Sequence, residues 1–481
     1  MDKKVNVITN MMWRLAERCG AQLVSFVVSV ILARLIEPSA YGQIALITVF
    51  TSILEVFINS GLGNSLIQKK DADDLDFSTV FYTNVTFCLL MYVILYIAAP
   101  FIADFYAMPD LTALVRVIGL TLIISGVKNV QCAYVSRNMQ FKLFFYSTLG
   151  GTIGAAVLGI AMAYMGFGVW ALVAQSLFNN TIDTVILWIN VKWRPKKEFS
   201  FSRLKRLYSY GWKLLVTSLI NTVYNDIRQL IIGKMYGPSD LAYYNKGNQL
   251  PNLAISNINS SIDSVLFPTM SSAQDDKARV KEMTRTSIRT SSYVIWPIML
   301  GLSAVATPMI RLLITDKWLP CVPYMRIFCF ALGFQPIHSA NLNAIKAMGR
   351  SDITLKLEII KKTMGILILV VVMPYGPFAI CASTIVYSFM AQVLNTYPNR
   401  ELLGYSYGEQ LKDILPFAAM SAVMCGAVLL IGLLPCGDVL KLALQIPAGI
   451  LFYIAQSIVF KVDVFYMLLD LVKKLLPKKK K

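Results

Sequence analysis

Two sets of polar residues recur at helical spacing within apolar stretches, and their chemistry suits a phosphorylated, hydroxyl-rich ligand. The first set is Arg14, Arg18, Gln22, Ser25 and Ser29. The second set repeats this spacing 199 residues later, at Lys213, Thr217, Asn221, Tyr224 and Arg228. At about 100° per residue, each set falls on one narrow face of a helix. Arginine and lysine bind phosphate oxygens, whereas amides both donate to and accept from sugar hydroxyls.

The segments that follow these two carry matching polar faces. One face holds Thr48, Ser52, Glu55 and Asn59, and the other holds Asn248, Asn252, Ser256, Asn259 and Asp263. A cavity lined by both copies gives these candidate substrate-binding residues: Arg14, Arg18, Gln22, Asn59, Lys213, Asn221, Arg228, Asn248, Asn252 and Asn259. Polar groups within membrane segments commonly mark functional sites. The alternative is that they pair between packed helices, with Arg14 and Lys213 extending to the cytoplasmic interface.

Carboxylates within apolar segments are the candidates for ion coupling. They are Glu55, Asp183, Asp226 and Asp263. Each could carry a proton or a sodium ion, or could neutralise a nearby arginine. Glu55 is the preferred candidate because it lies mid-segment on the same face as Ser52 and Asn59. The single histidine, His338, is predicted to be a packed hydrogen-bonding residue.

The composition places these residues in a membrane. Hydrophobic residues make up 56% of the 481 residues and charged residues 15%. Apolar runs of about 20 residues, the length that spans the hydrocarbon layer, recur along the whole chain. The fold class predicted is an all-α polytopic membrane protein with about fourteen spans. They cover residues 13–33, 41–64, 77–99, 111–131, 143–165, 168–191, 208–233, 241–266, 289–313, 322–345, 353–373, 376–397, 414–434 and 439–459.

The chain is predicted to contain a parallel internal repeat. Equivalent positions are Pro38 and Pro238, Arg116 and Arg326, and Lys128 and His338. Each copy holds six predicted spans, so both copies enter the membrane in the same orientation. The expected division is an N-terminal lobe (1–191), a basic cytoplasmic linker (192–207), a C-terminal lobe (208–397), two additional spans (398–460) and a basic amphipathic tail (461–481).

Lysine and arginine concentrate on one side of the predicted membrane. They include a run from Lys192 to Arg206 and the lysines at the C-terminus. The positive-inside rule therefore predicts that both termini are cytoplasmic. Topology and attraction to anionic membrane lipids explain most of the net charge of +18, so nucleic acid is not an expected partner.

The eight cysteines show no Cys-x-x-Cys spacing and form no cluster with histidine. We therefore expect no metal, no disulfide framework and no cofactor, apart from coupling to a proton or sodium ion. Cys321 and Cys436 both fall near the predicted outer side and could pair. The sequence carries no pattern typical of an enzyme, and we expect a transporter.

Several segments resemble one family of transporters. They are residues 31–42 (ILARLIEPSAYG), 61–68 (GLGNSLIQ), 166–173 (GFGVWALV), 193–195 (WRP) and 241–251 (LAYYNKGNQLP). In combination they resemble the Wzx-type polysaccharide flippases of the multidrug/oligosaccharidyl-lipid/polysaccharide exporter superfamily. The likeness is to the branch that exports colanic-acid-like and teichuronic-acid-like units. Ala242 departs from the glycine expected in the last segment.

The resemblance implies a bacterial inner-membrane protein with two six-helix lobes. It implies transport of an undecaprenyl-diphosphate-linked oligosaccharide to the outer leaflet, with polysaccharide polymerase and chain-length proteins as partners beside membrane lipids. Two other functions are considered. A cation-coupled multidrug exporter would favour carboxylates and aromatic faces over these cationic, amide-rich ones. A membrane-embedded glycosyltransferase or polymerase would be expected to carry a sizeable outer loop or soluble domain.

Overall fold

The computed structural model describes residues 3–59, 62–69 and 71–475. Contacts divide the chain into two compact units, Met1–Ala242 and Tyr243–Lys481. The elements within the described residues are helices, so the all-α prediction is confirmed.

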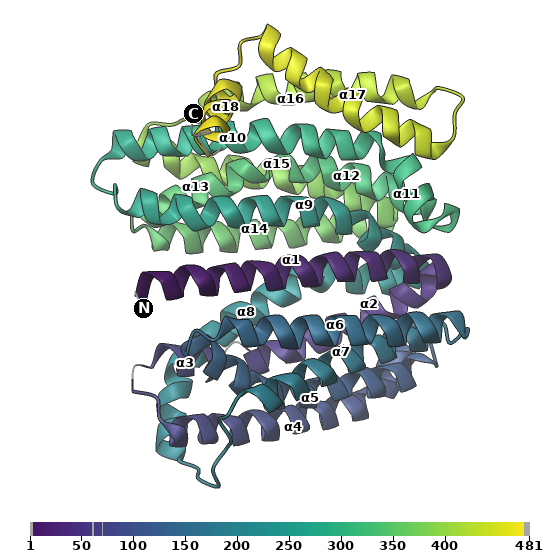
Figure 1. Cartoon of the computed structure of the whole chain (residues 1–481), viewed down its shortest axis with the longest axis vertical. Coiled ribbons are helices and arrows are strands. Elements are labelled where there is room, and N and C mark those ends of the chain that lie inside the picture. Colours follow the sequence, from purple (N-terminus) through teal and green to yellow (C-terminus); the bar gives the residue numbers. More distant parts are fainter. Residues whose placement is uncertain (1–2, 60–61, 70, 476–481) are drawn as a thin grey trace, which may run out of the picture. The chain divides into compact units, whose positions relative to one another are not determined.

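The first unit contains the first eight helices (Figure 1). They are α1 (Lys3–Leu35), α2 (Pro38–Asn59), α3 (Leu62–Gln68), α4 (Asp74–Tyr106), α5 (Leu111–Arg137), α6 (Phe141–Tyr164), α7 (Val169–Asn190) and α8 (Phe201–Met235). Helix α6 packs between α1 and α7, α4 packs on α5, and α8 packs on α2, α3 and α4. Two apolar clusters hold these helices together, one around Leu32 and Leu172 and the other around Phe77 and Trp193.

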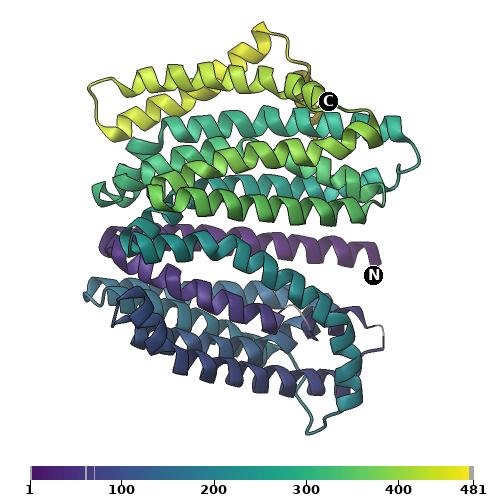
Figure 2. The ribbon, with the colours of Figure 1, turned by 180° about the vertical axis from the view of Figure 1, so that it is seen from behind.

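The second unit contains most of α9 (Pro238–Ser271) and the helices after it. They are α10 (Lys277–Ala304), α11 (Ala306–Ile314), α12 (Val322–Leu332), α13 (Gln335–Ala347), α14 (Ser351–Val372), α15 (Pro377–Leu403), α16 (Tyr407–Gly432), α17 (Asp438–Val459) and α18 (Asp463–Leu475), with short 3-10 turns at Asp316–Cys321 and Met373–Tyr375. Helix α15 packs on α12, α13 and α14. Helix α16 lies between α10 and α17 (Figure 2).

One detail of local structure occurs in both units, an aspartate that caps the start of a helix. Asp73 caps α4 by accepting a hydrogen bond from the Asp76 amide, and Asp276 caps α10 by accepting one from the Arg279 amide. Aspartate at this position satisfies one of the amides that a helix start leaves without a partner. The two caps are 203 residues apart, which is close to the offset of the predicted repeat.

The structure corrects two predicted spans in the second unit. The span expected at 289–313 is bent by 66° between α10 and α11. The span expected at 322–345 is divided into α12 and α13. Proline explains both breaks, because Pro308 and Pro336 lie in the first turns of α11 and α13 and lack an amide hydrogen. Helix α5 of the first unit, which corresponds to α12 and α13 in the predicted repeat, is continuous.

Eight described helices are long and apolar enough to cross a membrane, or nine if the bent pair of α10 and α11 forms one span. The chain is therefore a multi-span membrane protein. Helices α8 and α9, of 35 and 34 residues, are not among the eight. The polar residues on α8 and α9 lower the mean hydropathy of these helices. They include Asn221, Arg228, Asn248 and Asn252, which the sequence predicts as candidate binding residues.

Candidate functional site

Helix α1 is continuous through the first polar set, so the predicted single face is confirmed. Arg18 is exposed and Gln22 is half-buried. Arg14 instead lies 2.5 Å from Glu17 Oε2, and its guanidinium lies 5.1 Å from the centre of the Phe144 ring on α6. These contacts fit the alternative of pairing between packed helices at Arg14. They leave Arg18 and Gln22 available to a ligand.

Helices α2 and α8 meet through a polar contact. Ser52 Oγ donates to Asp226 Oδ2 at 2.9 Å, and Gln229 Nε2 donates to Asp226 Oδ1 at 2.9 Å. Asp226 therefore already has two donors. Arg228 is buried, and its guanidinium lies 5.7 Å from the centre of the Tyr224 ring one turn earlier.

The remaining predicted binding residues lie on both units. Asn221 of α8 and Asn248 and Asn259 of α9 are half-buried, and Asn252 of α9 is exposed. The side chains of Asn59 and Lys213 lie outside the described residues. Asp263 accepts a hydrogen bond from Asn343 Nδ2 of α13 at 2.6 Å, so this carboxylate is bound within its own unit.

A buried group of charges occupies the first unit. Lys128 of α5 forms an ion pair with Asp183 of α7, which is buried. Glu55 of α2 lies close enough to the same lysine to interact with it electrostatically. Asp183 Oδ1 is buried and has no hydrogen-bond partner among the described residues. Two of the four predicted coupling carboxylates therefore share one lysine.

The repeat aligns Lys128 with His338, but no sequence pattern predicts the pairing of Lys128 with Asp183. His338 lies 210 residues after Lys128, and Asn395 lies 212 residues after Asp183. Asn395 Nδ2 is 3.1 Å from His338 Nδ1. The prediction that His338 is a packed hydrogen-bonding residue is confirmed. The second unit thus places a neutral pair where the first has a charged one.

Beside this pair lies a network of buried amides. Asn341 Nδ2 donates to Gln410 Oε1 at 2.7 Å, and Asn399 Nδ2 donates to Asn341 Oδ1 at 2.6 Å. Thr396 Oγ1 donates to the same Gln410 oxygen at 3.2 Å. All four residues are fully buried. The network joins α13, α15 and α16 without using a charge.

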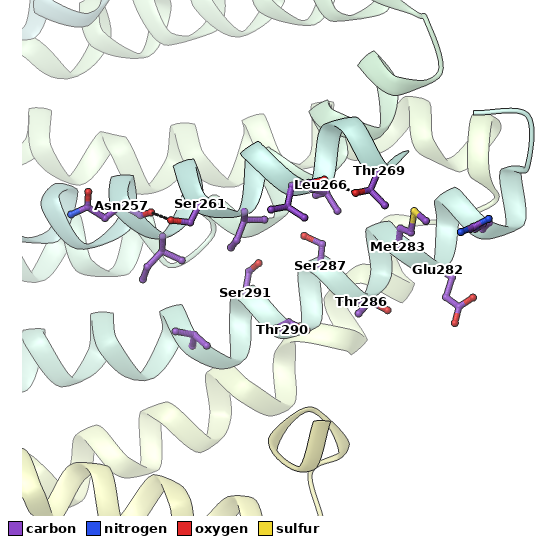
Figure 3. Close-up of a pocket in the computed structure, with 15 residues that line it drawn as sticks. Asn257, Ser261, Leu266, Thr269, Glu282, Met283, Thr286, Ser287, Thr290 and Ser291 are labelled. Atoms are coloured by element: carbon purple, nitrogen blue, oxygen red, sulfur yellow. Dashed lines mark hydrogen bonds between the residues drawn. The ribbon is translucent and has the colours of Figure 1, made fainter. Parts of the chain in front are cut away.

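A groove of about 1020 Å³ runs between α9 and α10 in the second unit (Figure 3). Its exposed walls are mainly apolar, with Asn257, Arg279 and Glu282 among the lining residues. Six hydroxyl groups line it, from Ser261, Thr269, Thr286, Ser287, Thr290 and Ser291. Ser287 and Ser291 point from α10 toward α9 in this view. Thr290 Oγ1 is buried without a partner among the described residues. Such a lining suits an amphiphilic molecule, and no sequence pattern predicted it.

The fold matches that of known membrane transporters. It is similar to the lipid II flippase MurJ in an inward closed conformation, with a TM-score of 0.75, 15% identity, and coverage of 95% of this chain and 100% of that one. It is also similar to an inward-facing multidrug resistance MATE family transporter, with a TM-score of 0.63, 14% identity, and coverage of 80% and 94%. The chain therefore has the fold of these multi-pass membrane proteins.

The sequence comparison identifies the family. The profile described as "Polysaccharide biosynthesis protein" matches residues 31–323, more than half of the chain, and the chain belongs to this family. TuaB of Bacillus subtilis, a teichuronic acid biosynthesis protein, is 24% identical over 90% of both chains. WzxC of Escherichia coli, a lipopolysaccharide biosynthesis protein, is 22% identical over 80% of both. ExoT of Rhizobium meliloti, a succinoglycan biosynthesis transport protein, is 24% identical over 72% of this chain and 70% of its own.

The family resemblance drawn from the sequence motifs is confirmed. The chain is a multi-span membrane protein of a polysaccharide biosynthesis family.

Proposed function

We propose that this chain moves an undecaprenyl-diphosphate-linked oligosaccharide repeat unit from the cytoplasmic to the outer leaflet of a bacterial inner membrane. The proposal includes fourteen spans, with six in each copy of the repeat, and cytoplasmic termini. The observation that carries it is the pair of polar faces, cationic and amide-rich, on equivalent helices. A family that serves polysaccharide biosynthesis supplies the class of cargo.

The physical need for a protein is clear for this substrate. A diphosphate and a sugar chain cannot cross hydrocarbon without large desolvation costs, whereas the polyprenyl chain is soluble there. In the proposal, Arg18 and Arg228 bind the diphosphate, and Gln22, Asn221 and Asn252 bind sugar hydroxyls. The groove between α9 and α10 in the second unit offers apolar walls with hydroxyls, which suit an amphiphilic molecule. Alternating access then exposes the head group to the opposite leaflet without covalent chemistry.

The coupling step of the proposal uses the charges around Lys128. Asp226 and Asp263 are bound by neutral donors, and Asp183 pairs with the lysine. Glu55 faces that lysine from a third helix, so binding of a proton or sodium ion at Glu55 would change the charge of the whole group. A group whose charge changes inside a membrane can bias a conformational equilibrium. Glu55 is therefore the proposed coupling residue.

The test uses the purified chain in vesicles that carry a fluorescent polyprenyl-diphosphate oligosaccharide and a membrane-impermeant quencher. We expect quenching of the inner leaflet pool only when the protein is present. Arg18→Gln should abolish this transport and Arg18→Lys should restore part of it, because lysine keeps the charge but loses the bidentate geometry.

The matched control is Arg350→Gln, since Arg350 pairs with Asp352 at an exposed site. This variant should transport at the rate of the unaltered protein. Transport of an organic cation in place of the lipid-linked sugar would overturn the proposal in favour of a multidrug exporter.

A further inference from the structure

A second cavity, of about 540 Å³, lies at the end of the second unit where α17 turns into α18. Its lining includes Arg289 of α10, Lys412 of α16 and Lys461 of the turn. The lining also includes the apolar side chains of Pro416 and Val423, which follow Lys412 along α16. This cavity is separate from the groove between α9 and α10, and the proposed transport mechanism does not use it.

The acidic residues at this cavity are already neutralised. Asp413 receives two hydrogen bonds of 2.8 Å from Arg285 and one of 2.7 Å from the Tyr405 hydroxyl. Asp463 forms an ion pair of 2.7 Å with Arg289. Since each carboxylate has its own arginine, neither is left to balance another cation.

Two lysines at the cavity remain without a counter-charge. Lys412 and Lys461 are exposed, and neither forms an ion pair with a described residue. Two buried polar atoms of the lining also lack partners among the described residues, namely Arg289 Nε and Gln456 Oε1. Buried polar groups are normally hydrogen-bonded, so an unpaired donor next to two lysines indicates an anionic ligand.

The position of the cavity indicates which class of anionic ligand can reach it. Helices α16 and α17 are both candidate spans, and Lys412 lies near the start of α16 while Lys461 follows the end of α17. Both lysines therefore lie at one membrane interface, next to apolar side chains that continue into the span. Helix α18 starts at this level and has apolar residues on one face, as interfacial helices do.

We propose that this cavity binds an anionic phospholipid. The phosphate contacts Lys412, Lys461 and Arg289 Nε, and an acyl chain lies along Pro416 and Val423. A lipid bound there links the turn before α18 to α16, in addition to the ion pair between Arg289 and Asp463. This site is independent of the substrate proposed above, because it requires only the general charge and apolar chains of a membrane lipid.

The experiment titrates the purified full chain, in a neutral detergent, with phosphatidylglycerol or with phosphatidylcholine of the same acyl chains, and counts bound lipids by native mass spectrometry. We expect one saturable site for phosphatidylglycerol that phosphatidylcholine does not fill. Inorganic phosphate should not displace the lipid. If phosphate alone binds as tightly as phosphatidylglycerol, or if both lipids bind equally, the lipid proposal is overturned.

The variants are Lys412→Gln and Lys461→Gln, which we expect to weaken binding roughly fivefold each, as is typical for one basic residue at an anionic membrane surface. The control carries Lys346→Gln and Lys356→Gln, two exposed lysines on α13 and α14. Because all four side chains are exposed, unfolding temperatures without lipid should be unchanged. Full binding by the Lys412/Lys461 double variant would contradict the proposal.

Discussion

The two units keep polar groups at equivalent buried positions but differ in their charge. In the first unit Lys128 pairs with Asp183, and in the second His338 pairs with Asn395. A third pair of equivalent positions, Arg116 and Arg326, is arginine in both units. Arg116 Nε of α5 donates to the Tyr96 carbonyl of α4 at 3.3 Å, and Arg326 Nε of α12 donates to the Ser303 carbonyl of α10 at 3.4 Å.

This difference indicates which of the two units should respond to an ion gradient. A neutral pair between packed helices contributes hydrogen bonds whatever the ion gradient. A buried ion pair must stay balanced, because removing one partner leaves an uncompensated charge in a medium of low dielectric constant. Glu55 adds a second carboxylate to the charged pair only. The first unit is therefore the expected place of ion dependence, and the second unit supplies a structural counterpart.

The largest effect is expected from Lys128→Met. The variant leaves the carboxylates of Asp183 and Glu55 without the cation that they share. Because an unpaired charge is then buried, the free energy of unfolding should fall by about 3–5 kcal/mol. We expect little monodisperse protein after detergent extraction. Adding Asp183→Leu and Glu55→Gln should recover much of the loss, since the site is then neutral. A stable Lys128→Met single variant would show that these charges are not mutually dependent.

A smaller effect is expected in the second unit from Asn341→Leu. The variant removes one partner each from Gln410 and Asn399, which keep their bonds to Thr396 Oγ1 and to the backbone carbonyl of residue 341. Each lost hydrogen bond costs about 0.5–1.5 kcal/mol. Thermal unfolding in detergent should show a clear loss of stability with transport per folded molecule retained. Loss of transport at full stability would assign the amide network a functional role instead.

The smallest effect is expected at the start of α4. The Arg203 guanidinium, together with the Asp76 amide, lowers the pKa of the Asp73 carboxyl to about 2. Because the pKa is depressed in the folded state, the stabilisation is present above the unfolded pKa of about 3.9 and is lost as the pH falls from about 4 to 2. For an exposed pair it amounts to about 0.2–1 kcal/mol.

Arg203→Ala should therefore flatten the acid limb of the stability profile over this range. Arg350→Ala, at the separate exposed pair with Asp352, is a useful comparison, since the Arg350 guanidinium likewise lowers the pKa of Asp352 to about 2. An unchanged profile in the Arg203 variant would mean that the cap alone lowers the pKa of Asp73.

Much of the architecture could be predicted from spacing alone. Helical periodicity places Arg18 and Gln22 on one face of a helix. The offset of the repeat predicts that Arg116 and Arg326 are equivalent positions. The bend after α10 and the break between α12 and α13 depend on prolines inside apolar segments, whose effect varies with context. The partner of Lys128 could not be predicted, because it depends on how α2, α5 and α7 pack. The groove between α9 and α10 depends likewise on the distance between two helices.

We propose that this protein moves lipid-linked sugars and that the charges of the first unit make the rate of transport depend on a proton or sodium gradient. The most direct measurement is the rate of transport in vesicles with and without proton and sodium gradients, for the unaltered chain, Glu55→Gln and His338→Gln. We predict that collapsing the gradients slows the unaltered chain and His338→Gln but not Glu55→Gln. Equal rates for the unaltered chain with and without both gradients would contradict the account and make Glu55 a structural residue.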